Sequence, residues 1–205
     1  MTMTVLSRQE IMRRFADAAR DPSLPDMRGD HDLNPDMRPE PPFKPAAVLV
    51  PLVERDGEIT VLLTKRSEHL SVHPGQVSFP GGHIDPEDLD AEMAALREAE
   101  EEVGLRRDRV DVVGRLATYH TRTGFEITPV VGLVRPPFTL APDATEVAEV
   151  FEVPLSFVLD PGNHERHSRE WQGMTRYFYV LPFMGYYIWG ATAGMLVNLA
   201  RFLGR

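Results

Sequence analysis

The sequence predicts an α+β domain in which one sheet dominates and an acidic helix lies near mid-chain. Two β-rich runs surround Asp56-Gly57, a dipeptide typical of hairpin turns. Residues 91–103 are strong helix formers, and Gly104 is well placed to end that helix. Strand-forming runs return afterwards, and the apolar segment 190–203 predicts a final core helix.

Residues 1–45 are predicted to form a short helix followed by an arm. Ser7-Arg-Gln-Glu10 has the pattern of a capping box and opens an amphipathic helix that runs to about Arg20. Seven prolines follow between Pro22 and Pro45, so this part can neither continue a helix nor join a central strand. We therefore expect an extended arm or linker, with the main domain spanning 46–205.

The remaining elements follow from the residue pattern of the main domain. A hairpin at 46–53 and 58–64 leads into a long glycine- and histidine-bearing loop at 65–82, followed by the helix at 91–103. Further strands are expected at 110–116, 126–134, 146–153, 167–171 and 175–181, with a short helix at 155–159.

Composition and charge exclude several classes of protein. The chain has 205 residues, a formal net charge of −9 and no cysteine. Disulfides, zinc-thiolate sites and a cysteine nucleophile are excluded, and such a chain suits a reducing cytoplasm, where we expect it. The acidic balance is against duplex nucleic acid as a partner. A phosphate-bearing substrate would need a metal cation to bridge the two negative partners.

One uncharged segment requires a test for membrane insertion. Residues 177–200 are long enough to span a bilayer, but Pro182 and three glycines interrupt them. The first part reads as a buried aromatic strand and the last as a core helix. We therefore expect no membrane partner.

The acidic helix carries the residues with the clearest chemical meaning. On a helix, Glu98, Glu101 and Glu102 lean over one face, and like charges at this spacing destabilise it by roughly 0.2–0.5 kcal/mol per pair. Carboxylate oxygens suit Mg²⁺ or Mn²⁺, and Arg97 could orient one of them through a two-pronged hydrogen bond. A solvated acidic face is the competing interpretation. The glycine pair Gly81-Gly82 favours a metal site over a solvated face, because a backbone carbonyl there can coordinate the metal.

These residues resemble the Nudix box. Gly82 followed by Arg97-Glu98-x-x-Glu101-Glu102-x-Gly104-Leu105 matches its second half, whereas the spacing from Gly82 to Arg97 is one residue too long. The first glutamate of the box has no clean counterpart, and Glu87 or Asp88 stands nearest to it.

One branch of the family, the coenzyme A pyrophosphatases, is similar over a wider span. The motif before the box runs Leu62-Leu-Thr-Lys-Arg-Ser-x-His69-Leu70, then His73-x-Gly-x-Val-x-Phe-Pro-Gly-Gly82, with Ser71 where the branch usually has arginine. Substrate contacts implied by this resemblance are Arg66, Ser67, His69, His73, Gly75, Phe79 and Gly81. The implied metal ligands are Glu98, Glu101, Glu102 and Gly82.

The resemblance implies a Nudix-type α/β/α sandwich with a mixed β-sheet. It also implies metal-dependent cleavage of coenzyme A to 4′-phosphopantetheine and adenosine 3′,5′-bisphosphate, using Mg²⁺ or Mn²⁺. Two alternatives are a Nudix enzyme for ADP-ribose, NADH or another nucleoside diphosphate derivative, and a non-catalytic nucleotide-binding module. A small-molecule substrate is expected in each case, and a homodimer is left open.

The general base is assigned less directly. Glu101 and Glu146 are the candidates; Glu146 lies beside a loop that often supplies the base in this family, or is an outward residue at a strand end. Histidine is a common general base near neutral pH, so His69, His73 and His120 are further candidates, although structural hydrogen bonding is favoured for each. Arg66 either pairs with a substrate phosphate or forms a salt bridge to the acidic helix.

Overall fold

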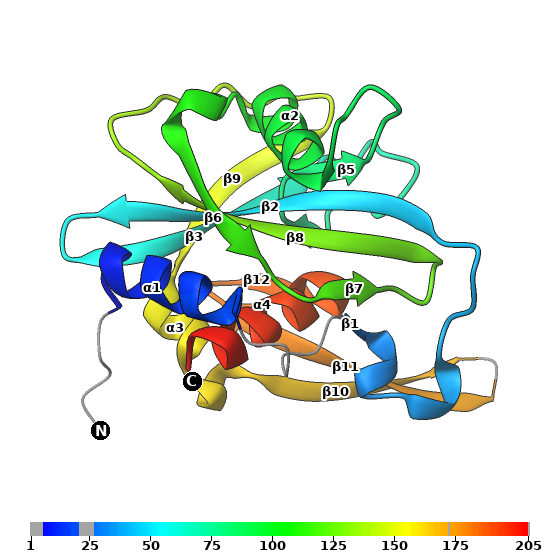
Figure 1. Cartoon of the computed structure of the whole chain (residues 1–205). Coiled ribbons are helices and arrows are strands. Elements are labelled where there is room, and N and C mark those ends of the chain that lie inside the picture. Colours follow the sequence, from blue (N-terminus) through cyan, green and yellow to red (C-terminus); the bar gives the residue numbers. More distant parts are fainter. Residues whose placement is uncertain (1–5, 21–26, 172, 205) are drawn as a thin grey trace.

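The structure is a computed structural model that describes residues 6–20, 27–171 and 173–204 (Figure 1). Its centre is a mixed sheet with helices on both sides. The strands of the main path are, in spatial order, β1 (Met27–Gly29), β7 (Thr118–His120), β8 (Phe125–Val134), β2 (Lys44–Arg55), β3 (Glu58–Arg66) and β4 (Val77–Ser78). Off this path, β5 (Gly81–His83) pairs with β2, β6 (Val110–Arg115) with β8, and β9 (Val147–Pro154) with β3.

The sheet is mixed because two neighbours of β2 run in opposite directions. Strand β2 is parallel to β8 from Lys44 to Val53 and antiparallel to β3 across the Asp56-Gly57 turn. Both faces of β2 are covered, so its side chains are almost continuously buried from Ala46 to Val53.

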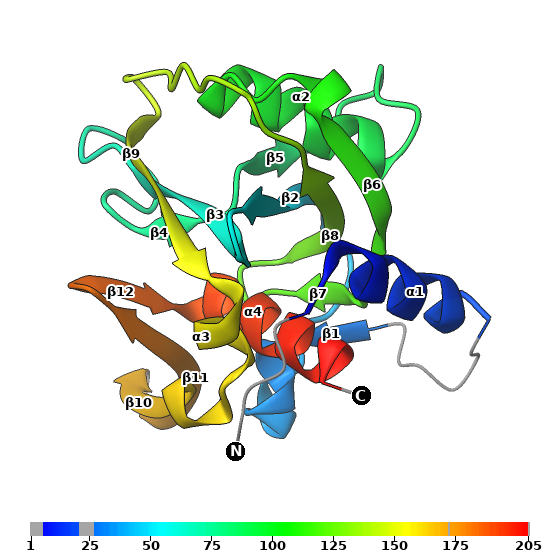
Figure 2. The ribbon, with the colours of Figure 1, turned by 90° about the vertical axis from the view of Figure 1, so that its left-hand side faces the viewer.

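Helix α2 (Ala91–Val103) covers one face, and α1 (Arg8–Ala18), α3 (Leu155–Leu159) and α4 (Gly190–Leu203) lie on the other (Figures 1 and 2). Small side chains let α2 approach the sheet, since Ala94, Ala95 and Ala99 are fully buried there. On the opposite side Phe15 of α1 packs 4.4 Å from Phe202 of α4, measured between ring centroids. Each face of the sheet therefore has a core of its own.

A second, antiparallel sheet consists of β10 (Glu165–Trp171), β11 (Met174–Phe183) and β12 (Tyr186–Trp189), of which β10 and β11 lie below α4 in Figure 1. The uncharged segment 177–200 is thus divided among β11, β12 and α4. None of the helices in the described part of the chain is long and apolar enough to cross a membrane.

The predicted α+β class, hairpin, helices and later strands are confirmed, including the bounds of α2, α3 and α4. The long loop at 65–82 was too simple a prediction, because it contains β4 and the start of β5. Both are short and use glycine or proline neighbours that mark loops in a sequence.

The extended arm is wrong for residues 27–38. They form β1 and two 3-10 turns, Asp30–Asp32 and Pro35–Met37. The prolines do not prevent this, because β1 contains none and pairs only at the sheet edge, with β7. Asp30 fixes the segment by accepting hydrogen bonds from the Tyr119 hydroxyl (2.9 Å) and an Arg176 nitrogen (2.8 Å). Residues 21–26 of the predicted arm lie outside the described part.

Candidate functional site

The acidic cluster belongs to the last two turns of α2. The helix begins behind Asp90, whose carboxylate accepts the Met93 N–H at 2.9 Å, and ends at Gly104 in the left-handed conformation (φ 70°). The helix is thereby fixed at both ends, so its register places Glu98 and Glu102 beside β5.

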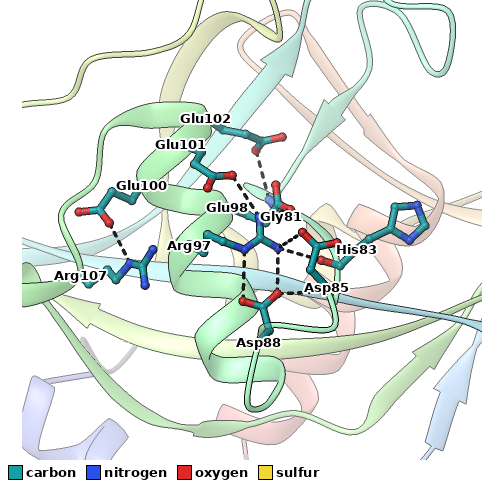
Figure 3. Close-up of polar contacts among 10 residues, drawn as sticks. All are labelled: Gly81, His83, Asp85, Asp88, Arg97, Glu98, Glu100, Glu101, Glu102 and Arg107. Atoms are coloured by element: carbon teal, nitrogen blue, oxygen red, sulfur yellow. Dashed lines mark hydrogen bonds and ion pairs between the residues drawn. The ribbon is translucent and has the colours of Figure 1, made fainter.

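Glu102 is the most deeply buried member of the cluster. Its side chain is 5% exposed, and one oxygen accepts the Gly81 N–H at 3.1 Å. The other oxygen lies 3.9 Å from an Arg66 guanidinium nitrogen. Figure 3 shows Glu102 aimed at the Gly81 backbone, apart from the contacts of Arg97.

Arg97 organises the rest of the cluster. One terminal nitrogen contacts Glu98 at 2.9 Å and Glu101 at 3.1 Å, as Figure 3 shows. The predicted carboxylate-orienting role of Arg97 agrees with these contacts. Its two-pronged hydrogen bond, however, goes to Asp88, through Nε at 3.2 Å and Nη2 at 2.9 Å.

Asp88 also belongs to the cluster, although the sequence alone did not assign it a contact. Its side chain is 3% exposed, and Arg97 holds the pKa of this carboxyl below its usual value. One Asp88 oxygen also accepts the Asp85 N–H at 3.0 Å. The acidic pair Glu87-Asp88 was apparent in the sequence. Because the spacing to Arg97 is one residue longer than in the Nudix box, the pattern could not decide which of the two contacts Arg97.

The glycine pair brings the backbone against the carboxylates. Gly82 pairs with Ala47 of β2, and a Cβ added at Gly82 would lie 2.6 Å from a Glu98 carboxylate oxygen. Gly81 has φ 155°, and a Cβ there would lie 2.4 Å from the Ala47 carbonyl oxygen. A side chain at Gly81 would meet the backbone of β2, and one at Gly82 would displace the Glu98 carboxylate, so the two glycines let β5 lie this close to β2 and α2.

The carboxylates repel one another in the absence of a cation. Burial, together with the charges of Glu98 and Glu146, raises the pKa of Glu102 to about 7, although the Gly81 N–H and Arg66 act in the opposite direction. Burial also raises the pKa of Glu98, against the pull of Arg97. One buried and one partly buried carboxylate that both disfavour their charged forms are a chemically suitable donor set for a hard divalent cation.

The described residues do not contain a group of three aspartate, glutamate or histidine side chains already arranged around a cation. Glu102 is buried and Glu98 is partly buried, whereas the Glu101 side chain is 60% exposed and contacts Arg97. A metal held by all three would require Glu101 to leave Arg97. The Gly82 carbonyl stays a predicted ligand.

Some of the predicted substrate-contacting residues lie beside the carboxylates, and others are exposed on the loop that follows β3. Arg66 ends β3 beside Glu102, and its Nε is buried without a hydrogen-bond partner among the described residues. Ser67 is 4% exposed and donates its N–H to the Glu146 carbonyl at 2.8 Å. His69 and His73 are exposed on the loop that follows. Gly75 has φ 66°, and a Cβ there would collide with the Glu68 carboxylate.

Phe79 requires a correction. It is 2% exposed and belongs to the core cluster on the α4 side of the sheet, so it supports the loop from beneath and cannot present its ring to a substrate. His120 Nε2 donates a hydrogen bond to the Glu126 carboxylate at 2.9 Å, which is the structural hydrogen bonding favoured for it. Glu146 is exposed, and its charge acts on both Glu98 and Glu102.

Comparison with known proteins defines the class. The NUDIX domain profile matches residues 43–176. Proteins named "Uncharacterized Nudix hydrolase NudL" from Enterobacter sp. (strain 638) and Escherichia coli (strain K12) are each 42% identical over 159 residues, which cover 78% of this chain and 82% of theirs. The MutT protein of Methanosarcina mazei Go1 has a similar fold, with a TM-score of 0.51 at 21% identity over 80% of this chain and 96% of that one.

Fold and site together are those of a hydrolase that acts on a small molecule. The chain belongs to the Nudix family. Enzymes of this family generally use divalent metal ions such as Mg²⁺ or Mn²⁺.

Proposed function

We propose that the protein hydrolyses the pyrophosphate bond of coenzyme A in a metal-dependent reaction. The observation that carries this proposal is the position of Arg66 and Gly81, which belong to the motif similar to coenzyme A pyrophosphatases and both reach Glu102 of the Nudix box. The segment 62–82 thus meets the carboxylates where a substrate would lie against them. A general phosphoanhydride site would need the box but not this motif.

Glu98 and Glu102 would hold a divalent cation, with Glu101 joining once it leaves Arg97. When bound, such a cation neutralises the pyrophosphate and acidifies a coordinated water. The cluster is prepared for this because Arg97, anchored by Asp88, fixes the Glu98 side chain. Glu102 would have to be deprotonated to bind the cation. Because its pKa is raised, metal binding would depend on pH.

Arg66 would bind the phosphate group. Its Nη1 is 3.9 Å from Glu102, longer than a hydrogen bond, and its Nε has no hydrogen-bond partner among the described residues. The guanidinium therefore has donors left for phosphate oxygens. Two interpretations of Arg66 followed from the sequence, phosphate binding and pairing with the acidic helix. This geometry supports both, because Arg66 lies beside Glu102 of α2 and still has donors available for a phosphate.

Glu146 is the proposed general base. Its charge acts on Glu98 and Glu102, and its backbone carbonyl accepts the Ser67 N–H, which ties the residue before β9 to the residue after β3. Glu101 is occupied by Arg97. The water would lose its proton to Glu146 and attack one phosphorus; the bridging P–O bond breaks and the other phosphate leaves.

A cavity on the other side of the same strand end suits the non-nucleotide arm of the substrate. It has a volume of about 450 Å³ and is lined by Lys65, Gln76, Met184, Tyr187 and Trp189, among others. Lys65 lines it while the next residue, Arg66, reaches Glu102. An elongated chain of methylene and amide groups fits a cavity with aromatic walls and one cation.

The test is incubation of the purified protein with coenzyme A, ADP-ribose, NADH and nucleoside triphosphates, with and without Mg²⁺ or Mn²⁺, and identification of products by mass. Metal-dependent release of 4′-phosphopantetheine from coenzyme A supports the proposal. Cleavage of the other compounds alone would retain the Nudix chemistry and refute the substrate. No cleavage of any compound would favour a nucleotide-binding module.

A further inference from the structure

Strand β10 is an edge strand on the side of the molecule away from α2 (Figures 1 and 2). It is the first strand of the second sheet and pairs only with β11 within the described part of the chain. Six of its seven residues are exposed. A regular edge of this length is a template for another strand unless the sequence blocks it, and β10 contains no proline or bulge.

The backbone groups that face outward can be identified from β11. Tyr177 donates its N–H to Asn34 Oδ1 at 2.8 Å, and its carbonyl accepts from Asn34 Nδ2 at 2.9 Å. Since Tyr177 lies opposite Ser168, these two residues form a non-hydrogen-bonded pair of the antiparallel ladder. The N–H and C=O groups of Ser168 therefore point away from β11, as do those of Arg166 and Glu170.

The sequence of β10 is complementary to itself. In an antiparallel pair of identical edges, outward-facing residues must meet outward-facing residues, which restricts the possible registers. Full overlap of Glu165–Trp171 with its copy places Ser168 opposite Ser168 of the second copy. Arg166 then lies opposite the second copy's Glu170, and the same pair recurs across the two-fold axis. Shifting the centre to Arg169 would bring two arginines together.

The two charges are available for this pairing. Among the described residues Arg166 has no carboxylate partner and lies over the Tyr177 ring, with its guanidinium carbon 4.1 Å from the ring centroid. Within the same described part of the chain, the Glu170 carboxylate accepts a side-chain hydrogen bond only from the Thr175 hydroxyl. Exposed aromatic surface borders the same edge, since Tyr177 is 38% and Trp171 48% exposed. Closing the edge would cover part of this apolar surface.

We infer that β10 pairs with β10 of a second copy of this chain, in antiparallel orientation about Ser168, to form a two-fold dimer with a continuous six-stranded sheet. Arg166, Ser168 and Glu170 would each exchange two backbone hydrogen bonds with their counterparts. An interface of this small size predicts a dimer that dissociates on dilution. The α2 carboxylates lie across the molecule from this edge, so the two active sites stay open.

Sedimentation of the full chain over a concentration series tests the inference. Arg166→Glu places two carboxylates opposite each other and should raise the dimer dissociation constant by about tenfold or more. Glu170→Arg should do the same, and the double variant Arg166→Glu/Glu170→Arg should restore the wild-type constant. Arg106→Glu is the matched control for net charge, because its side chain is 70% exposed elsewhere on the surface.

Ser168→Pro tests the backbone contacts without any change of charge. It removes the outward N–H at the two-fold axis and leaves the β11 ladder intact, so the folded monomer should persist by circular dichroism while the dimer is lost. A wild-type chain that stays monomeric at every concentration would overturn the inference. So would a dimer that survives both Arg166→Glu and Ser168→Pro. These readouts involve no substrate and are independent of the proposed reaction.

Discussion

The adjacent glycines of β5 allow the metal assignment to be tested separately from the fold. Gly82 has no positive φ, so alanine there introduces no backbone strain. Its Cβ would lie 2.6 Å from one Glu98 oxygen and 2.8 Å from the other, closer than van der Waals contact by more than half an ångström. The obstacle is the end of a flexible side chain, which can turn away.

Gly82→Ala should therefore displace the Glu98 carboxylate while the fold remains intact. We expect a stability loss below about 1 kcal/mol, hence a Tm shift below about 4 °C. Displacing a metal ligand by this amount should lower kcat/KM by roughly 10- to 100-fold and weaken Mn²⁺ binding. The assays are thermal unfolding, Mn²⁺ titration and metal-dependent turnover of coenzyme A.

Gly81→Ala is the matched control. Its Cβ would meet the backbone of β2, 2.4 Å from the Ala47 carbonyl oxygen, at a φ that alanine rarely adopts. This variant should lose about 1–3 kcal/mol of stability. Wild-type turnover and Mn²⁺ affinity in Gly82→Ala would refute the reasoning, because Glu98 could then move without consequence for the metal.

Three further outcomes follow from the site. Glu102→Gln should abolish turnover while the protein stays folded. In the wild type, the Mn²⁺ affinity measured by titration should fall about tenfold per pH unit below pH 7, because the Glu102 carboxylate, whose pKa is about 7, becomes protonated. Asp88→Asn should lower Tm by a few degrees at pH 7, and the difference should shrink at a pH low enough to protonate Asp88 in the wild type, whose folded pKa is depressed. Tyr187→Ala should raise KM for coenzyme A roughly tenfold and leave kinetics with ADP-ribose, if cleaved, unchanged; equal effects on both substrates would contradict the cavity assignment.

The sequence predicted elements well where local chemistry decides them. Helix α2 has strong helix formers and a left-handed Gly104 at its end, and α3 and α4 match their expected ranges. Strand β12 was missed, because Tyr186–Trp189 sits in one uncharged run with β11 and α4. Its separation depends on the turn at Met184-Gly185 and on pairing with β11, which is a tertiary contact.

The acidic helix and its arginine were predictable as a cluster, but the partners of each atom were not. Spacing places Glu98 and Glu102 on one side, whereas the conformation of the 83–90 loop decides that Asp88 receives the two bonds of Arg97. Phe79 shows the opposite limit. A motif residue that packs under a loop cannot be distinguished, by its letter alone, from one that contacts a ligand.

The ring contact between Phe15 and Phe202 has a consequence for synthesis of the chain. The core on that face of the sheet needs α1, which leaves the ribosome early, and α4, which leaves nearly two hundred residues later. Until α4 has been synthesised, the apolar side of α1, formed by Ile11 and Phe15, lacks the contact with α4. The core on this face therefore cannot be completed before α4 has been synthesised, and until then the nascent chain carries an apolar surface that is prone to aggregation.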